Sequence, residues 1–188
     1  DGPYTDKRRF LIFDYCGNFE FFREKEKEFQ GSEVKSLSEA IFSKKVRLIA
    51  LLQEGNYADQ DHQDFRAELI EGCRTQVTAL NPELVAVRLK LRYVEKYKEA
   101  SAYAALSETD KGELTTYLAP LVFMDDADEM AKRFDNFIYG MMLAALEASS
   151  RFSYAKRQLC DLVGALMKKA SIPQVKAVLP LLQSIQEE

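Results

Sequence analysis

SLSEAIFSKKVRLIALLQEG, residues 36–55, is the stretch that decides the fold class. Apolar residues recur through it at the spacing of one helical face: Leu37, Ile41, Val46, Ile49, Ala50 and Leu52. Ser36 and Glu39 have the spacing of a capping box, in which each side chain bonds the other residue's backbone N–H. Gly55 then supplies a residue suited to a helix end. The stretch therefore predicts an amphipathic helix over 36–55.

The same periodicity continues along most of the chain. It predicts helices at about 61–80, 84–98, 107–118, 124–150 and 152–169, and a last one from 171 onward. Asn81 with Pro82 ends the second of these, and Asn81 suits an N-cap for the next. Ser107 with Asp110 is a further cap, Pro120 ends that helix, and Pro180 kinks or divides the last.

The segment 84–98 fits two patterns. Val85, Val87 and Leu89 alternate with other residues as in a strand. A helical face is equally available, made of Leu84, Val87, Leu91, Val94 and Tyr97. The Asn-Pro start, with no partner strand nearby, favours a helix.

The N-terminal residues differ in pattern from the rest of the chain. An apolar run is bounded by Asp6 on one side and by Asp14 and Gly17 on the other, which is typical of a strand buried on both faces. Its residues include Phe10, Leu11, Ile12, Phe13 and Tyr15. The charged sequence REKEKE and Gly31 come next, as a connector. We therefore expect a mainly α chain: a multi-helix bundle over 32–188, with one orphan N-terminal β-strand and its connector in 1–31.

Composition narrows the class of protein. The formal net charge of the 188 residues is −4 and the pI about 5.3, so no overall basic field attracts nucleic acid. No apolar stretch is long enough to span a membrane and no signal peptide is visible, which predicts a soluble, cytoplasmic protein with no membrane partner. Three separated cysteines and a single histidine, His62, fit neither a zinc site nor a disulfide framework.

Two charged clusters could carry chemistry. Asp125, Asp126, Asp128 and Glu129 crowd the start of a helix, where carboxylates complement the helix dipole, so capping outweighs metal binding or acid–base catalysis. Basic residues gather further upstream, where the candidates for DNA contact are Arg88, Lys90, Arg92 and Lys96. On one helix, four-residue spacing could follow a phosphate backbone. Glu95 and Glu99 interrupt the stripe, and a solvated helical face is the alternative interpretation.

The helix at 124–150 has an apolar face that suits a protein core or a partner groove, with core the favoured interpretation. Its members are Met130, Phe134, Phe137, Ile138, Met141 and Leu146. No GxxxxGK[ST], GxGxxG, HExxH or GxSxG motif occurs, so we predict no catalytic residue, no metal ligand and no cofactor in this chain.

Several segments together resemble a known family. In chain order, these segments are RFLIFDYCGNFEFF, SLSEAIF, LRYVEKYK, LAPLV, DDADEMAKRFDNFIYGMMLAALE and SIPQVKAVLPLL. They resemble the C-terminal helical region of the motor and endonuclease (R) subunit of type I restriction enzymes, after the second RecA-like lobe of this DEAD/DEAH box helicase superfamily. The resemblance implies a parent that is an ATP-dependent DNA translocase and type I site-specific deoxyribonuclease. Its ATP, Mg²⁺ and nuclease sites would lie upstream, and so would the lobe against which the strand at 10–15 is expected to pack.

The resemblance also implies partners: the modification and specificity subunits of the complex, and duplex DNA through the parent. The leading hypothesis is a non-catalytic module that docks and couples the motor to the methyltransferase core. Direct contact with the DNA backbone and a stand-alone helical interaction domain are alternatives, and an enzyme built on the acidic cluster is the least favoured. An isolated chain could also dimerise through its unpaired strand.

Overall fold

A computed structural model describes residues 35–123 and 128–187, which belong to one compact unit, Lys35–Glu188. These residues form helices and connecting turns, and no strand occurs among them. The mainly α fold is thus confirmed. The predicted N-terminal strand, with Phe10 to Phe13 and Tyr15, lies outside the described residues. Of the described helices, none combines the length and the apolar character needed to cross a membrane.

The helix predicted from the opening stretch is α2, Leu37–Leu51. Ser36 is its N-cap, and the Ser36 hydroxyl accepts a hydrogen bond from the Glu39 N–H at 3.1 Å. The helix ends earlier than predicted, with Leu52 as its C-cap, and Gly55 instead opens a short 3₁₀ turn, η1 (Gly55–Tyr57).

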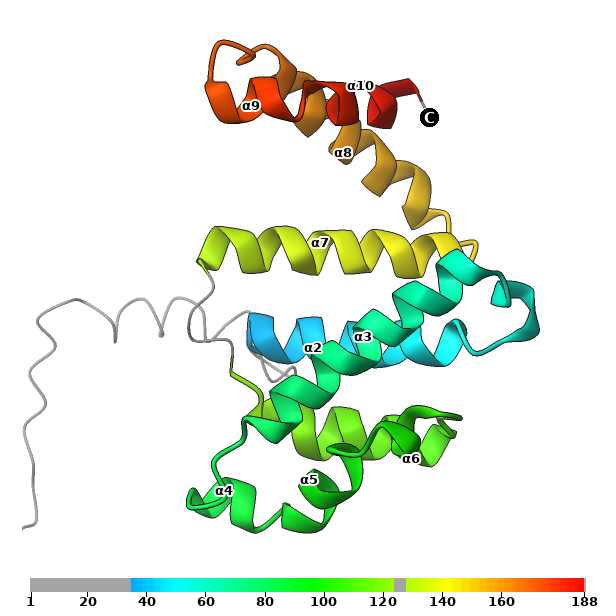
Figure 1. Ribbon diagram of the computed structural model, residues 1–188, viewed down its shortest axis with the longest axis vertical. Helices are drawn as coiled ribbons and strands as arrows, with labels where there is room; N and C mark the ends of the chain where they lie inside the picture. Colours follow the sequence, from blue (N-terminus) through cyan, green and yellow to red (C-terminus); the bar gives the residue numbers. More distant parts are fainter. Residues whose placement is uncertain (1–34, 124–127, 188) are drawn as a thin grey trace, which may run out of the picture. The chain divides into compact units, whose positions relative to one another are not determined.

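The remaining elements follow in the order seen in Figure 1. They are α3 (Gln60–Thr78), α4 (Val85–Arg88), α5 (Leu91–Tyr97), η2 (Ala100–Tyr103), α6 (Glu108–Glu113), the π-helical turn η3 (Leu114–Leu118), η4 (Ala119–Leu121), α7 (Glu129–Leu146), α8 (Arg151–Met167), α9 (Pro173–Ala177) and α10 (Leu179–Glu187).

Helix α2 lies at the centre of the core. It packs against α7 and α3, and also against α6, η3 and η4. Five of its apolar side chains have no solvent exposure: Ile41, Phe42, Val46, Leu48 and Ile49. At 100° per residue these five side chains fall within a sector of roughly 160°. Arg47 is the one exposed residue of α2, so neighbours cover the helix around most of its circumference.

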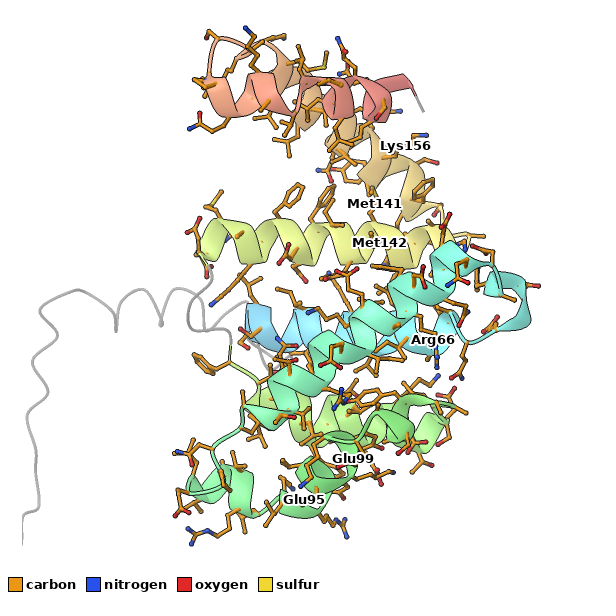
Figure 2. The ribbon with its side chains drawn as sticks, in the orientation of Figure 1. Arg66, Glu95, Glu99, Met141, Met142 and Lys156 are labelled. Carbon is orange, nitrogen blue, oxygen red and sulfur yellow. The ribbon has the colours of Figure 1, made fainter. Side chains whose placement is uncertain are left out.

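Arg66 of α3 ties three elements together (Figure 2). Its guanidinium donates to the Ile49 carbonyl of α2 at 3.1 Å, to the Tyr103 carbonyl of η2 at 2.8 Å and to the Ala104 carbonyl at 3.1 Å. Partial burial lowers the pKa of Arg66 from its ordinary value. Three carbonyls near helix ends thereby gain a charged donor.

The segment 84–98 is helical, as predicted, but it is divided into α4 and α5 by a break at Leu89 and Lys90. Asn81 does not cap a helix, because its side chain accepts from the Glu83 N–H in a turn and Leu84 is the N-cap of α4. Leu89 is 76% exposed. With Tyr93, Val94 and Tyr97 buried below the break, α5 is positioned by its own contacts with α3, η2 and η3 rather than by continuity with α4.

The cap at Ser107 is confirmed as a complete capping box with Asp110. The helix that it opens continues as the π-helical turn η3 to Leu118, and Pro120 lies in the following 3₁₀ turn. The last predicted helix is divided, with α9 and α10 meeting at Val178, two residues before Pro180. Both outcomes follow from the missing N–H and fixed φ of proline.

Replacing Arg66 with Met should lower the free energy of unfolding by about 2–4 kcal/mol, because the stem is retained while three carbonyls lose a charged donor. Urea denaturation followed by circular dichroism measures the change. The matched control is Arg133→Met, since Arg133 is exposed and makes one ion pair with Glu129; it should change stability by less than about 0.5 kcal/mol. Equal losses of stability in Arg66→Met and Arg133→Met would contradict the conclusion that Arg66 connects α3 to α2 and η2.

Candidate functional site

The four basic candidates for DNA contact lie on two helices and the break between them. Arg88 ends α4, Lys90 is the N-cap of α5, and Arg92 and Lys96 lie on α5. Because the helix is interrupted, Arg88 does not continue the row that Arg92 and Lys96 form at four-residue spacing. The predicted stripe is therefore two separate groups of cations.

Carboxylates neutralise part of this stripe. The Lys96 ammonium lies 2.7 Å from Asp110 Oδ1 and 2.8 Å from Glu113 Oε2, so it bridges two acids of α6. Arg88 lies 3.4 Å from Glu83. The acids that interrupt the stripe are Glu95 and Glu99 (Figure 2), and Glu95 pairs with Lys98.

Tyrosine rings hold the other two cations. The Tyr93 and Tyr117 rings stack with centroids 4.5 Å apart. Lys90 Nζ lies 4.5 Å from the centre of the Tyr117 ring, and the Arg92 guanidinium lies 4.4 Å from that of Tyr93, while also donating to the Tyr93 hydroxyl. These are cation–π distances. Lys90 and Arg92 therefore belong to an aromatic cluster that joins α5 to η3.

The network around Lys96 has shifted proton affinities. Hydrogen bonds from Lys96 and Ser107 hold the pKa of Asp110 well below its usual range, and a hydrogen bond from Lys96 also lowers the pKa of Glu113. The same two carboxylates raise the pKa of Lys96. The Tyr97 hydroxyl completes the group: its oxygen lies 2.9 Å from Asp110 Oδ1 and 2.7 Å from Glu113 Oε2, and its one proton is shared between these two acceptors. This arrangement fastens α5 to α6.

Acid should weaken this connection. Asp110 has a depressed folded-state pKa, so its contribution is complete above the unfolded value of about 3.9 and is lost as pH falls toward the lower folded value. We expect the wild type to lose stability from about pH 5 downward, and Asp110→Asn to show a shallower loss over the same range. Thermal melts between pH 7 and pH 2 measure this. Asp64→Asn is the control. If Asp110→Asn leaves the dependence of stability on pH unchanged, the stabilising role of the network around Lys96 is contradicted.

Helix α7 carries apolar residues on two opposite sides. Tyr139, Met142, Leu143 and Leu146 belong to the core around α2. At 100° per residue the opposite side carries the set that we call the outer face of α7: Met130, Phe134, Phe137, Ile138 and Met141. Leu146, predicted to share that side, instead packs in the core. The labelled Met141 side chain extends from α7 toward α8 in Figure 2.

The outer face of α7 is only partly covered. Met130 is 67% exposed and Phe134 is 45% exposed, while Phe137, Ile138 and Met141 are half-buried. The prediction that this face forms core is therefore wrong for Met130 and Phe134. Helix α8 packs against α7, yet these two side chains near the start of α7 remain open to solvent.

Two cations of α2 fix α7 in place. Lys44 Nζ donates to the Asn136 carbonyl at 2.6 Å and to Asn136 Oδ1 at 2.7 Å, and burial lowers the pKa of Lys44, with repulsion from Arg47 adding to the effect. Arg47 lies 2.5 Å from Glu147 Oε1. Lys44 pairs with Asn136, and Arg47, further along α2, pairs with Glu147, further along the chain. The two helices therefore run parallel, as Figure 1 shows.

Among the described residues, the remaining candidate groups do not assemble into a reactive centre. Asp128 and Glu129 are exposed, and Asp128 is the N-cap of α7 without a side-chain hydrogen bond; Asp125 and Asp126 lie outside the described residues. His62 Nδ1 pairs with its own N-cap residue, Asp59, at 2.6 Å. Burial raises the pKa of the Cys73 thiol to about 12. Within 35–123 and 128–187, no three metal-ligating side chains gather.

Comparisons with known proteins identify no relative: no protein-family model, no curated protein and no solved structure matches this chain.

Proposed function

We propose that this chain is the C-terminal helical region of the R subunit of a type I restriction enzyme, and that it acts there as a non-catalytic docking and coupling module. In this proposal the module joins the ATP-dependent motor to the methyltransferase core. ATP, Mg²⁺ and the nuclease centre belong to the parent protein upstream. The resemblance of the quoted segments supports the family, and the surface of α7 supports the docking role.

The outer face of α7 is the observation that carries the docking role. From Met130 to Met141 it extends about 16 Å along the helix, since each residue adds about 1.5 Å. Met and Phe side chains on a helix are typical of a surface that fits into the groove of a partner. Full burial of a Met or Phe side chain is worth roughly 1.5–3 kcal/mol, and a partner that covers Met130 and Phe134 would recover the part of this that their exposed surface represents.

A coupling role also requires that α7 be rigidly attached. Lys44 and Arg47 hold α7 to the buried helix α2, and Arg66 holds α2 to α3 and η2. A force applied to the outer face of α7 would thus be transmitted through α2 to the rest of the core. This chain of contacts favours a stiff connector over a flexible tether.

Contact between duplex DNA and Arg88, Lys90, Arg92 and Lys96 gains no support from their surroundings. Lys96 has two carboxylate partners and Arg88 has one. Lys90 and Arg92 have no carboxylate partner among the described residues, but both lie over tyrosine rings. Contact through these four residues stays a prediction.

A binding assay with purified subunits tests the docking role. The chain should bind the complex of modification and specificity subunits, and Phe134→Glu should weaken that binding by about tenfold or more, because a charge would enter the centre of the apolar contact. Phe123→Glu is the matched control, since Phe123 is also an exposed phenylalanine, at 76%, and precedes α7 rather than belonging to its outer face.

Biolayer interferometry at moderate salt gives the dissociation constants, and circular dichroism establishes that each variant is folded. Absence of wild-type binding would remove the docking role. Equal weakening by Phe134→Glu and Phe123→Glu would show that the outer face of α7 is not the contact surface.

A further inference from the structure

The C-terminal helices carry an excess of positive charge. Six of the 26 basic residues of the chain, but only three of its 30 acidic residues, lie at or after position 151. The basic residues are Arg151, Lys156, Arg157, Lys168, Lys169 and Lys176, and the acidic ones are Asp161, Glu187 and Glu188. This local charge is opposite in sign to the net charge of −4 of the whole chain.

Two of these cations, Arg151 and Arg157, lie on one side of α8, and Lys168, its C-cap, and Lys169 follow at its C-terminal end. At 100° per residue, Tyr154, Gln158 and the carboxylate Asp161 share the sector of roughly 120° that holds Arg151 and Arg157. These seven residues, four cations and one acid among them, are exposed, and we call them the outer face of α8. The opposite side holds Val163, which is 3% exposed, with Leu159 and Met167 half-buried. That apolar side packs against α7 and α10.

The cations of this face lack carboxylate partners within the part of the chain that the structure describes. No ion pair there involves Arg151, Arg157, Lys168 or Lys169. This contrasts with Arg88 and Lys96, which carboxylates neutralise. The side chains of the outer face of α8 can therefore approach an external polyanion without first breaking an ion pair.

We propose that the outer face of α8 binds the phosphate backbone of duplex nucleic acid without regard to sequence. Unpaired arginines and lysines along one side of a helix are the residues that neutralise phosphates and release counterions. An anionic membrane fits less well, because a membrane-bound helix directs its apolar side outward, whereas the apolar side of α8 faces α7 and α10. This inference adds a nucleic-acid contact to the docking role and is independent of it.

The salt dependence of binding gives the proposal a quantitative form. Each phosphate neutralised contributes about −0.9 to the slope of log K against log salt. With the four unpaired cations engaged, the slope should approach about −3.6 at full contact. Removing two of the cations should make it shallower by about 1.8.

A matched pair of charge reversals tests the assignment. Arg157→Glu with Lys168→Glu alters the outer face of α8, and Lys35→Glu with Arg133→Glu changes the net charge equally at two exposed cations that each have one ion-pair partner four residues away. Fluorescence anisotropy with a labelled duplex of mixed sequence, about 30 base pairs long, from about 50 to 200 mM salt, measures affinity and slope. We expect at least about tenfold loss and the shallower slope for the α8 pair, and less than about threefold change for the control.

Three results would overturn the proposal: no binding of the wild-type chain to the duplex at about 50 mM salt, equal loss in both variants, or binding to vesicles of anionic phospholipid with none to the duplex. Because Arg157 and Lys168 are exposed and lack ion-pair partners within the described residues, the α8 variant should fold, and circular dichroism checks this.

Discussion

The burial of α2 on most of its circumference is the constraint on which the rest of the structure depends. Ile41, Phe42, Val46, Leu48 and Ile49 are inaccessible to solvent, and of all the residues of α2 only Arg47 is exposed. Helices α3 and α7 cover two sides and the segment from α6 to η4 covers another. Polar contacts then fix these neighbours: Arg66 attaches α3, while Lys44 and Arg47 attach α7.

Local signals predicted the helices well where a cap was present. Ser36 begins α2 and the Ser107–Asp110 capping box begins α6, because each cap satisfies backbone groups only a few residues away. The break between α4 and α5 was missed. The spacing around Leu89 suits a continuous helix, and it is the burial of Tyr93 and Tyr97 against other elements that determines where α5 begins.

Contacts distant in sequence were beyond a pattern-based prediction. Arg66 has carbonyl partners 17, 37 and 38 positions away, and nothing beside Arg66 in the sequence indicates them. The apolar side of α7 was recognised, but periodicity does not tell which of two apolar sides meets α2. The charge of α8 could have been found, since the basic residues after position 150 are visible in the sequence; the denser basic group at 88–98 obscured it.

The surfaces thus have separate physical characters. The basic group of α4 and α5 is largely satisfied within the chain, by Asp110, Glu113 and tyrosine rings, and so contributes mainly to packing. The outer face of α7 is apolar and suits a protein partner. The outer face of α8 is cationic and suits a polyanion. A module that links a DNA motor to another subunit would use both the outer face of α7 and the outer face of α8.

The most direct test of this account is hydrogen–deuterium exchange of the chain with and without the modification and specificity subunits. The account predicts new protection in the backbone amides of α7 from Met130 to Met141, with residues 41–50 of α2 slow to exchange in both states. Unchanged exchange along α7, or protection confined to α4 and α5, would contradict it.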